Sequence, residues 1–350
     1  MQKRTLKIAD ITVGDSAKCF VIAEIGHNHQ GKIHLAKEMI KAAANAGASA
    51  VKLQKRNNKS LFTKDYYNQI YNSENSFGSI YGEHRENLEF NRDQYVELQK
   101  FSSDLGVIFF ATAFDFESAD FLAELNVPAF KLASGDLKNI PLIRYVAALG
   151  KPVILSTGGG TLEDVDRAVA ELDNSGASYC IMQCTAGYPP AWDELNLRVI
   201  SEFRSRYQNP VIGFSSHDNG IAMASAAFAL GARMIEKHFT TNRTLKGTDH
   251  AFSLEPQGLQ KMVRDLDRLH IAMGDGQKRQ FDSEKEPLRK MGKKLVVIRE
   301  MKVGEVLSIG DIAFRSPGDG LAPYMVDSFI GKRLTRDVPE EHTLSLEDVN

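Results

Sequence analysis

CFVIAEIG (19–26), IHLAKEMIKAAANAG (33–47) and ASAVKLQ (48–54) form the stretch of sequence that decides the fold. The first and third segments are short, apolar and rich in β-branched residues, which is typical of strands. The middle segment has apolar residues at i, i+3, i+4 and i+7 and closes on a glycine, which is typical of an amphipathic helix. Two nearly continuous apolar strands joined by a helix indicate a parallel sheet that is covered on both faces.

The same unit recurs along the chain to about residue 273. The apolar runs are CFVIAEIG (19–26), ASAVKLQ (48–54), VIFFATA (107–113), AFKLAS (129–134), PVILST (152–157), SYCIMQC (178–184), PVIGFSS (210–216) and MIEKHFT (234–240). Eight such units match a (β/α)₈ TIM barrel, an α/β fold, in both number and length. The alternative is a doubly wound open sheet, which usually opens with a glycine-rich nucleotide turn, and AEIGHNHQG (23–31) is not one.

The composition changes after the last barrel unit. We expect a catalytic barrel domain over residues 1–275, a linker over 276–292 and a small β-rich domain over 293–350. The linker is polar and charged and lacks apolar periodicity. A domain of about 58 residues is marginal on its own, so we expect it to dock on a barrel, its own or that of a neighbouring chain.

One predicted loop of the barrel, residues 55–90, is far longer than the usual connection. It is too rich in aromatic residues for a disordered linker. We interpret it as a lid or an interface arm over the mouth of the barrel.

The composition excludes several classes of protein. The 350 residues carry a formal charge of −2, without the basic excess of a nucleic-acid binder. The longest nearly apolar stretch, residues 221–232, is too short to cross a bilayer, and the N-terminus lacks the apolar core of a signal peptide. Cys19, Cys180 and Cys184 fit buried free thiols in a reducing compartment. We therefore expect a cytoplasmic protein with neither nucleic-acid nor membrane partners.

Polar side chains stand at the end of every predicted strand, where TIM barrels carry their active sites. They are Glu24; Lys52 and Gln54; Thr112; Lys131, Ser134 and Asp136; Ser156 and Thr157; Gln183, Thr185 and Tyr188; Ser215 and His217; and Glu236 and His238. Burial of an unpaired charge is costly, so residues such as these need partners or ligands. Their convergence predicts a functional site.

Two lysines, Lys52 and Lys131, stand among hydroxyl side chains in this set. Lysine supplies point charge and hydroxyls supply hydrogen-bond donors, which suits a small, highly charged phosphate or carboxylate anion. The alternatives are that each lysine pairs with a glutamate of a neighbouring strand, or that one forms a Schiff base with a substrate.

His217 and His238 end consecutive strands, so their imidazoles can share one ion. Two histidines completed by water or substrate oxygens suit a divalent transition metal. The alternative is that each histidine only makes hydrogen bonds. His27 and His29 are explained by a polar loop after the first strand.

The motifs resemble those of a known family. AEIGHNHQG, VKLQ, YGEHRENLEF, FKLASGD, ILSTGG, QCTAGYP, NLRVI, SSHDNGI, EKHFT and KGTDHAFSLEP occur in the order found in sialic acid synthases. The resemblance covers essentially the whole chain, and its C-terminal part resembles that family's antifreeze-like (SAF) domain. It implies a barrel that condenses phosphoenolpyruvate with N-acetylmannosamine, or a phosphorylated or deoxy relative, and releases phosphate.

The resemblance also implies roles for individual residues. His217 and His238 would hold the divalent metal, Mn²⁺ or Mg²⁺, and Glu24 would serve the proton transfers. Phosphoenolpyruvate would be held by Lys52, Thr112, Lys131, Ser134, Ser156 and Ser215. The amino sugar would be faced by Gln54, Asp136, Tyr188 and Asp249.

The chain departs from the family's pattern at a few positions. Ser216 precedes the first metal histidine where many bacterial members have an acidic residue, Asp136 replaces Glu, and Gly187 replaces Asn. The SAF arginine that reaches a partner subunit's sugar is displaced, and we expect Arg315 to take its place in a domain-swapped homodimer.

Two other functions are compatible with these residues. A metal-dependent barrel hydrolase would also use a histidine pair with carboxylates, and it would need further histidine or carbamylated-lysine ligands. A non-catalytic sugar-binding protein would use the SAF domain for recognition, but it has no need of a metal pair beside two lysines.

Overall fold

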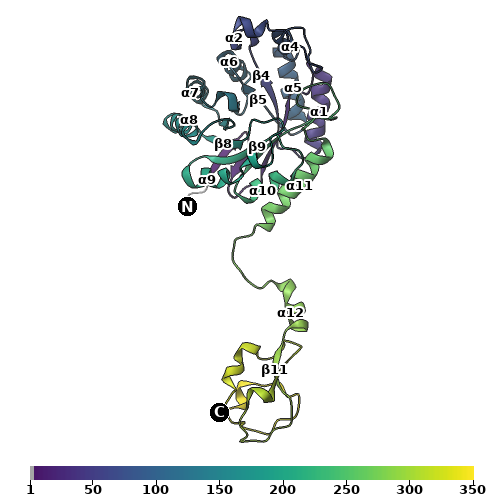
Figure 1. Ribbon diagram of the computed structural model, residues 1–350, viewed down its shortest axis with the longest axis vertical. Helices are drawn as coiled ribbons and strands as arrows, with labels where there is room; N and C mark the ends of the chain where they lie inside the picture. The colour runs from purple at the N-terminus through teal and green to yellow at the C-terminus, as the bar shows by residue number, and fades with distance from the viewer. Residues whose placement is uncertain (1–3) are drawn as a thin grey trace. The chain divides into compact units, whose positions relative to one another are not determined.

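The computed structural model describes residues 4–350 and divides into two compact units between Gly274 and Asp275. Eight parallel strands close into a barrel in the first unit, and helices surround it (Figure 1). The barrel strands are β3 (Phe20–Gly26), β4 (Ala50–Lys55), β5 (Ile108–Ala113), β6 (Phe130–Leu132), β7 (Val153–Ser156), β8 (Tyr179–Cys184), β9 (Val211–Ser216) and β10 (Met234–His238). The predicted TIM barrel is confirmed.

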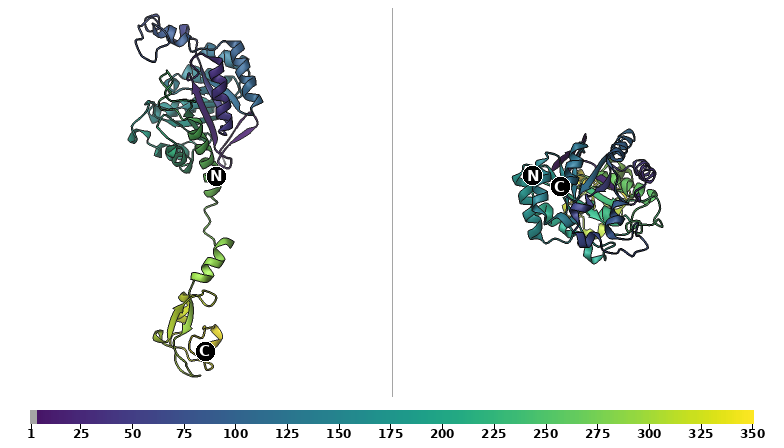
Figure 2. Two further views of the ribbon diagram at one scale, coloured as in Figure 1. Left: turned by 90° about the vertical axis from the view of Figure 1, so that its right-hand side faces the viewer. Right: turned by 90° about the horizontal axis from the view of Figure 1, so that it is seen from above.

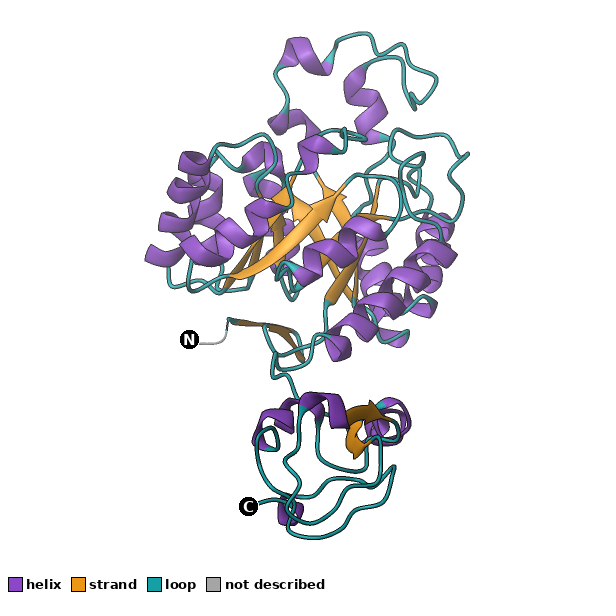
Figure 3. Ribbon diagram, turned by 60° about the horizontal axis from the view of Figure 1, so that its bottom comes forward, coloured by secondary structure: helices purple, strands orange, loops and turns teal. Residues whose placement is uncertain are grey.

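The barrel closes where β10 pairs with β3. Every strand is almost wholly buried because side chains fill the barrel on one face and helices cover the other. The covering helices are α1 (Ile33–Asn45), α5 (Arg92–Asp104), α6 (Phe116–Glu124), α7 (Ile140–Ala148), α8 (Leu162–Asn174), α9 (Arg198–Arg206), α10 (Ala222–Ala229) and α11 (Pro256–Ala272). Figure 3 shows the strands gathered inside this ring.

Local capping fixes where several helices begin. At α5, Asn91 accepts the N–H of Gln94, and the Gln94 side chain accepts the N–H of Asn91. Thr161 and Asp164 form the same reciprocal pair at α8. Each box satisfies two backbone donors that the first turn leaves free.

A two-stranded hairpin that the sequence analysis does not predict precedes the barrel. It pairs β1 (Thr5–Ile8) with β2 (Ile11–Gly14), and Leu6, Ile8 and Val13 join the barrel's hydrophobic core. Its strands have only four residues each, too few for alternation to stand out in the sequence.

The long segment after β4 folds into three short helices at one end of the barrel (Figure 2). These are α2 (Asn58–Leu61), α3 (Lys64–Tyr67) and α4 (Tyr81–Glu86). Its aromatic residues pack on one another, with Tyr81 within 5.4 Å, ring centre to ring centre, of Tyr66, Tyr71 and Phe62. Phe77, His84, Arg85 and Leu88 line the cavity at the barrel mouth. The segment therefore lies over the mouth, as expected of a lid or arm.

The second unit has a separate core around Leu295, Met301, Phe329 and Leu334. It contains one antiparallel strand pair, β11 (Lys294–Val297) with β12 (Ile312–Arg315). Isolated bridges such as that between Met301 and Val338 add further pairing outside these strands. The segment predicted as a linker contains a helix, α12 (Lys285–Met291). No helix within residues 4–350 is long and apolar enough to cross a membrane.

Candidate active site

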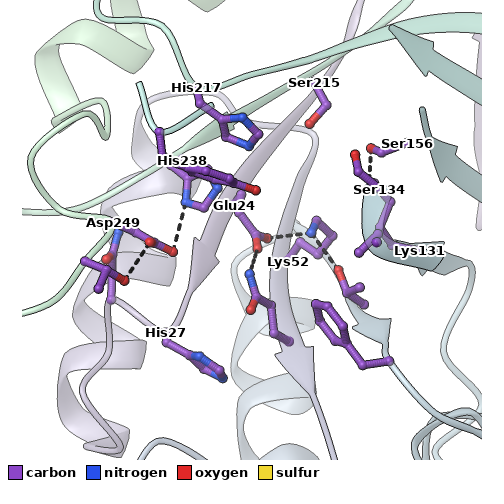
Figure 4. A pocket seen from close by; sticks show the side chains of 18 of the residues that line it. Glu24, His27, Lys52, Lys131, Ser134, Ser156, Ser215, His217, His238 and Asp249 are labelled. Carbon is purple, nitrogen blue, oxygen red and sulfur yellow. Dashed lines mark hydrogen bonds and ion pairs between the residues drawn. The ribbon is translucent and has the colours of Figure 1, made fainter. Parts of the chain in front are cut away.

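The C-terminal ends of the barrel strands surround a cavity of about 530 Å³ (Figure 4). Most residues predicted for the site line it: Glu24, Lys52, Gln54, Thr112, Lys131, Ser134, Ser156, Tyr188, Ser215, His217, Glu236, His238 and Asp249. They come from all eight strands or the segments that follow them. The parallel barrel brings them together because all its strands end on the same side.

Charged residues form the floor of this cavity. The Nζ of Lys52 lies 2.8 Å from Glu24 Oε2 and 2.8 Å from Thr112 Oγ1. The Nζ of Lys131 lies 2.6 Å from Ser156 Oγ. Strand register explains the first contact, because Lys52 stands opposite Glu24 in the pairing of β3 with β4.

Glu236 lies between the two lysines and is the main residue to which the sequence analysis assigned no role. Its Oε1 is 3.6 Å from the Nζ of Lys52 and 3.9 Å from the Nζ of Lys131, and it accepts a hydrogen bond from Ser215. Both lysines therefore have carboxylate neighbours, but only Lys52 pairs with a glutamate of a neighbouring strand, Glu24, as the alternative proposed. Glu236 on β10 reaches Lys131 on β6 from a strand that does not adjoin β6. The available sequence signal was its position two residues before His238, which places both side chains on the same face of a strand.

Burial and this charge network set the protonation of the floor. Burial raises the pKa of Glu24 above its usual value, and Lys52 only partly offsets the shift. Burial also disfavours the charged form of Glu236, but Lys131 and Lys52 lower its pKa overall. The pKa of Lys131 is lowered by burial, whereas that of Lys52 is raised because Glu236 and Glu24 outweigh its burial. Glu24 is thus the carboxyl of the floor best suited to carry a proton.

The two histidines face each other at the cavity wall, with ring centres 5.3 Å apart. His217 Nδ1 lies 2.9 Å from the carbonyl oxygen of Thr185. A neutral His217 donates its Nδ1–H there, which leaves Nε2 with a free lone pair. His238 Nδ1 is buried and has no hydrogen-bond partner, and Asp249 Oδ2 lies 3.6 Å from it.

This pair fits a divalent metal. Burial lowers the pKa of both histidines, that of His217 to about 4, so both are neutral near pH 7 as metal ligands must be. The unpaired His238 nitrogen lacks a partner that an ion would supply. No group of three or more His, Cys, Asp or Glu within residues 4–350 is arranged to hold a metal. Water or substrate oxygens would therefore complete the coordination.

Five residues predicted for the site are absent from the cavity lining. Three of them donate hydrogen bonds to backbone carbonyls instead: Thr157 to Met182, Gln183 to Leu195 and Thr185 to Glu194. Asp136, in the 3-10 turn Ser134–Asp136, is absent from the cavity lining and accepts a hydrogen bond from Asn139. Arg315 belongs to the second unit, where it pairs with Glu341.

The loop histidines do not supply the extra ligands that a hydrolase would need. His29 stacks on Phe90, with ring centres 4.2 Å apart, and accepts the N–H of Gly31. His27 does line the cavity, but Arg56 and Arg85 lie against its two ring nitrogens. Neither arginine is among the residues predicted for the site from the strand ends, although Arg56 continues the alternation of Lys52 and Gln54.

Comparisons with known proteins agree with the site. The sequence profile of the NeuB family matches residues 39–278, and that of the SAF domain matches residues 294–350. The N-acetylneuraminate-9-phosphate synthase of Homo sapiens is 37% identical, over 97% of this chain and 94% of its own length. The N,N'-diacetyllegionaminic acid synthase of Campylobacter jejuni is 34% identical, over 93% of this chain and 99% of its own.

A solved structure gives the same result. The N-acetylneuraminic acid synthetase of Leptospira borgpetersenii, in complex with citrate, superposes with a TM-score of 0.73 at 32% identity. The match covers 81% of this chain and 95% of that one. The resemblance seen in the motifs is therefore confirmed: the chain belongs to the NeuB family.

Proposed function

We propose that this protein is a nonulosonic acid synthase, which condenses phosphoenolpyruvate with N-acetylmannosamine or a related acetamido sugar and releases phosphate. The observation that carries the proposal is the pairing of two subsites in one cavity. A lysine- and hydroxyl-lined floor suits a small anion, and two neutral histidines beside it suit a metal. The named relatives are synthases of N-acetylneuraminate 9-phosphate and of N,N'-diacetyllegionaminic acid, which supports the same reaction.

The floor would hold phosphoenolpyruvate. Lys52 and Lys131 would place positive charge against its phosphate and carboxylate oxygens, and Thr112, Ser134, Ser156 and Ser215 would donate hydrogen bonds. Glu24 and Glu236 already lie beside these lysines. The phosphoenolpyruvate trianion would therefore bind most tightly when one of the two carboxyls is protonated, because this removes a negative charge next to it. Glu24, whose pKa is raised by burial, is the group that would take up this proton.

His217 and His238 would hold a divalent ion, Mn²⁺ or Mg²⁺, which when bound supplies Lewis-acid polarisation of the open-chain sugar aldehyde. Gln54, Tyr188 and Asp249 line the cavity around this position and would orient the sugar, with Asp249 also beside His238. Asp136 does not line the cavity, so it would influence the sugar only by holding the turn that it shares with Ser134.

The bond changes then follow. C3 of phosphoenolpyruvate attacks the aldehyde carbon, and the aldehyde oxygen takes a proton and becomes a hydroxyl. Water adds at C2 and gives up a proton. The C2 hydroxyl of the tetrahedral intermediate then loses its proton to the phosphate as C2=O forms and the bond from C2 to the phosphate oxygen breaks. Glu24 would donate the first proton and accept the second, while the lysines stabilise the departing phosphate.

We propose further that the protein is a cytoplasmic homodimer in which each SAF domain covers the partner's barrel mouth. Segment 276–292 supports this arrangement, because with α12 helical it can still reach about 45 Å. Arg315, exposed on β12, is the residue we expect to contact the partner's sugar. Twofold symmetry would form both copies of the contact at once.

Phosphate release tests the reaction directly. The purified chain with Mn²⁺ and phosphoenolpyruvate should release phosphate only when an acetamido sugar is present, and mass spectrometry should detect the nonulosonic acid. A panel of N-acetylmannosamine, its 6-phosphate and diacetamido sugars would identify the substrate. Release that does not depend on any sugar would indicate a hydrolase and contradict the proposal.

A further inference from the structure

Two arginines that the proposed reaction does not use face the same cavity. Arg56 follows directly after β4 and is only 9% exposed. Its guanidinium lies 3.6 Å over the ring of Phe114, and its Nη2 donates to Gln54 Oε1 at 2.8 Å. Arg56 is therefore held in place with its charge in the cavity wall.

Arg85 reaches the cavity from α4 in the segment over the mouth. Its Nε donates to the hydroxyl of Tyr81 at 3.0 Å. Its Nη1 lies 3.4 Å from His27 Nδ1, and Arg56 Nη1 lies 3.2 Å from His27 Nε2. Two guanidinium groups thus flank one imidazole.

This arrangement leaves donors unsatisfied. Burial and the two arginines lower the pKa of His27 well below its usual value, so the ring is neutral. A neutral imidazole has one accepting nitrogen and one N–H. One of the two arginines consequently points an N–H group at the N–H of the imidazole and makes no hydrogen bond with it.

The arginines also lack a counter-ion. Within residues 4–350, no carboxylate lies within 4.0 Å of the guanidinium nitrogens of Arg56 or Arg85. Glu89, beside His27, instead lies 2.6 Å from the Nζ of Lys55. Two neighbouring cations without a carboxylate in a partly enclosed site favour the binding of an anion.

Arg56 and Arg85 lie at a different depth in the cavity from the lysines of its floor. Lys52 and Gln54 lie on β4 and Arg56 directly follows it at the next alternate position, and all three side chains line the cavity. At about 3.3 Å per residue, Arg56 lies about 13 Å along the strand from Lys52. Gln54, which is predicted to face the sugar, lies between these two levels, because it donates to Glu24 of the floor and accepts from Arg56. An anion at the arginines would therefore belong to the far end of the sugar.

We propose that Arg56 and Arg85 form a phosphate subsite, and that the preferred second substrate is an acetamido sugar phosphorylated at the end remote from its aldehyde. This inference rests on the proposed function for the identity of the sugar. The fork of a guanidinium matches phosphate oxygens in pairs, and Arg85 on α4 would connect phosphate binding to the segment over the mouth.

Binding and turnover should be measured together on the full chain. Isothermal titration with N-acetylmannosamine 6-phosphate and with N-acetylmannosamine compares affinities without requiring turnover. The wild type should bind the phosphorylated sugar at least about tenfold more tightly, since charge-assisted hydrogen bonds are the stronger kind. Arg56→Gln and Arg85→Gln should each raise the dissociation constant of the phosphorylated sugar about 10- to 100-fold. The fold-change in the dissociation constant of the free sugar should be smaller by a factor of at least about ten.

Controls separate charge from packing. Arg92→Gln removes an exposed arginine on α5 that pairs with Glu124 and should change neither affinity. Arg85→Lys keeps the charge and should lose less affinity than Arg85→Gln. Equal losses in these two variants would attribute the effect to altered packing and overturn the subsite.

Other outcomes also decide the matter. Equal wild-type affinity for the two sugars would overturn the subsite, as would a rise in the phosphoenolpyruvate KM as large as that for the phosphorylated sugar. Tight, arginine-dependent binding of the phosphorylated sugar without any phosphate release would support the subsite and contradict the proposed synthase.

Discussion

Asp218 and Lys237 form a buried ion pair, with 2.9 Å between Asp218 Oδ1 and Lys237 Nζ. Asp218 directly follows His217, and Lys237 directly precedes His238. Lys237 also donates to the backbone carbonyl of Asp218, and Ser216 hydrogen-bonds the same carboxylate. The pair therefore ties together the two strand ends that carry the histidines.

Loss of this pair should affect both stability and metal binding. Lys237→Met leaves the Asp218 carboxylate buried without its partner, which should lower the free energy of unfolding by about 3–5 kcal/mol. Urea unfolding measures this loss, and titration with Mn²⁺ should show weaker binding. Lys100→Met, which removes an exposed pair with Asp104, should change stability by less than about 1 kcal/mol. Similar effects of the two substitutions would refute the role of the pair.

The histidines should be essential for turnover. His217→Ala and His238→Ala should each lower kcat by more than about a hundredfold, since even residues that only support metal ligands change affinity 10- to 100-fold. Circular dichroism should show an intact fold. A chelator should inactivate the wild type and Mn²⁺ should restore it, whereas exposed His34 on α1 should tolerate alanine. Full activity after complete chelation would contradict the metal role.

The floor lysines should matter more for phosphoenolpyruvate than for the sugar. Lys52→Met and Lys131→Met should each weaken phosphoenolpyruvate binding by about 2–5 kcal/mol, partly because Glu236 is left with less positive charge beside it. Adding Glu236→Gln to Lys131→Met should restore stability but only part of the phosphoenolpyruvate affinity, because the contact of the lysine itself stays lost. A sugar adduct trapped by borohydride would instead indicate a Schiff-base lysine.

Sharing of sites between subunits can be tested by mixing variants. Arg315→Ala and His217→Ala chains should each be impaired alone. If each SAF domain serves the partner's barrel, one site of the mixed dimer carries both changes and the other carries neither, so activity should return after subunit exchange. No recovery after demonstrated exchange would mean that each domain serves its own barrel or that Arg315 has no role.

Acid should destabilise the second unit through Asp348, whose side chain is fully buried. Burial alone would raise the pKa of Asp348, but hydrogen bonds from His342, the Ser345 backbone and Arg336 lower it from 3.8 to about 2. Since the folded pKa is the lower one, the stabilisation is complete above about pH 4 and is lost as pH falls through 2. It amounts to about 2 kcal/mol.

Hydrogen exchange of residues 294–350 in the full chain measures this effect. Asp348→Asn should lower protection at pH 6 by the equivalent of about 2 kcal/mol, and the difference should shrink toward pH 2. Asp327→Asn, at an exposed position, serves as the control. A difference that stays constant with pH would contradict the assigned cause.

Local pattern in the sequence was enough for the barrel and for most of its site. Each strand is a nearly continuous apolar run, and each is long enough to stand out between helices with 3.6-residue periodicity. Once eight parallel strands are recognised, their ends must meet on one side, so residues as distant as Glu24 and His238 are predicted to lie together. The family motifs then supplied expected roles for individual residues.

Only the tertiary structure decided which charges meet. Whether Glu236 approaches Lys52 depends on the register at which β10 closes on β3, a contact between segments more than 180 residues apart. Arg85 reaches His27 because α4 folds back over the mouth, whereas the turn around Asp136 takes that carboxylate out of the cavity wall. Periodicity is a property of neighbouring residues in the chain, but register, closure and loop placement result from many distant contacts acting together, and no short stretch of sequence contains them.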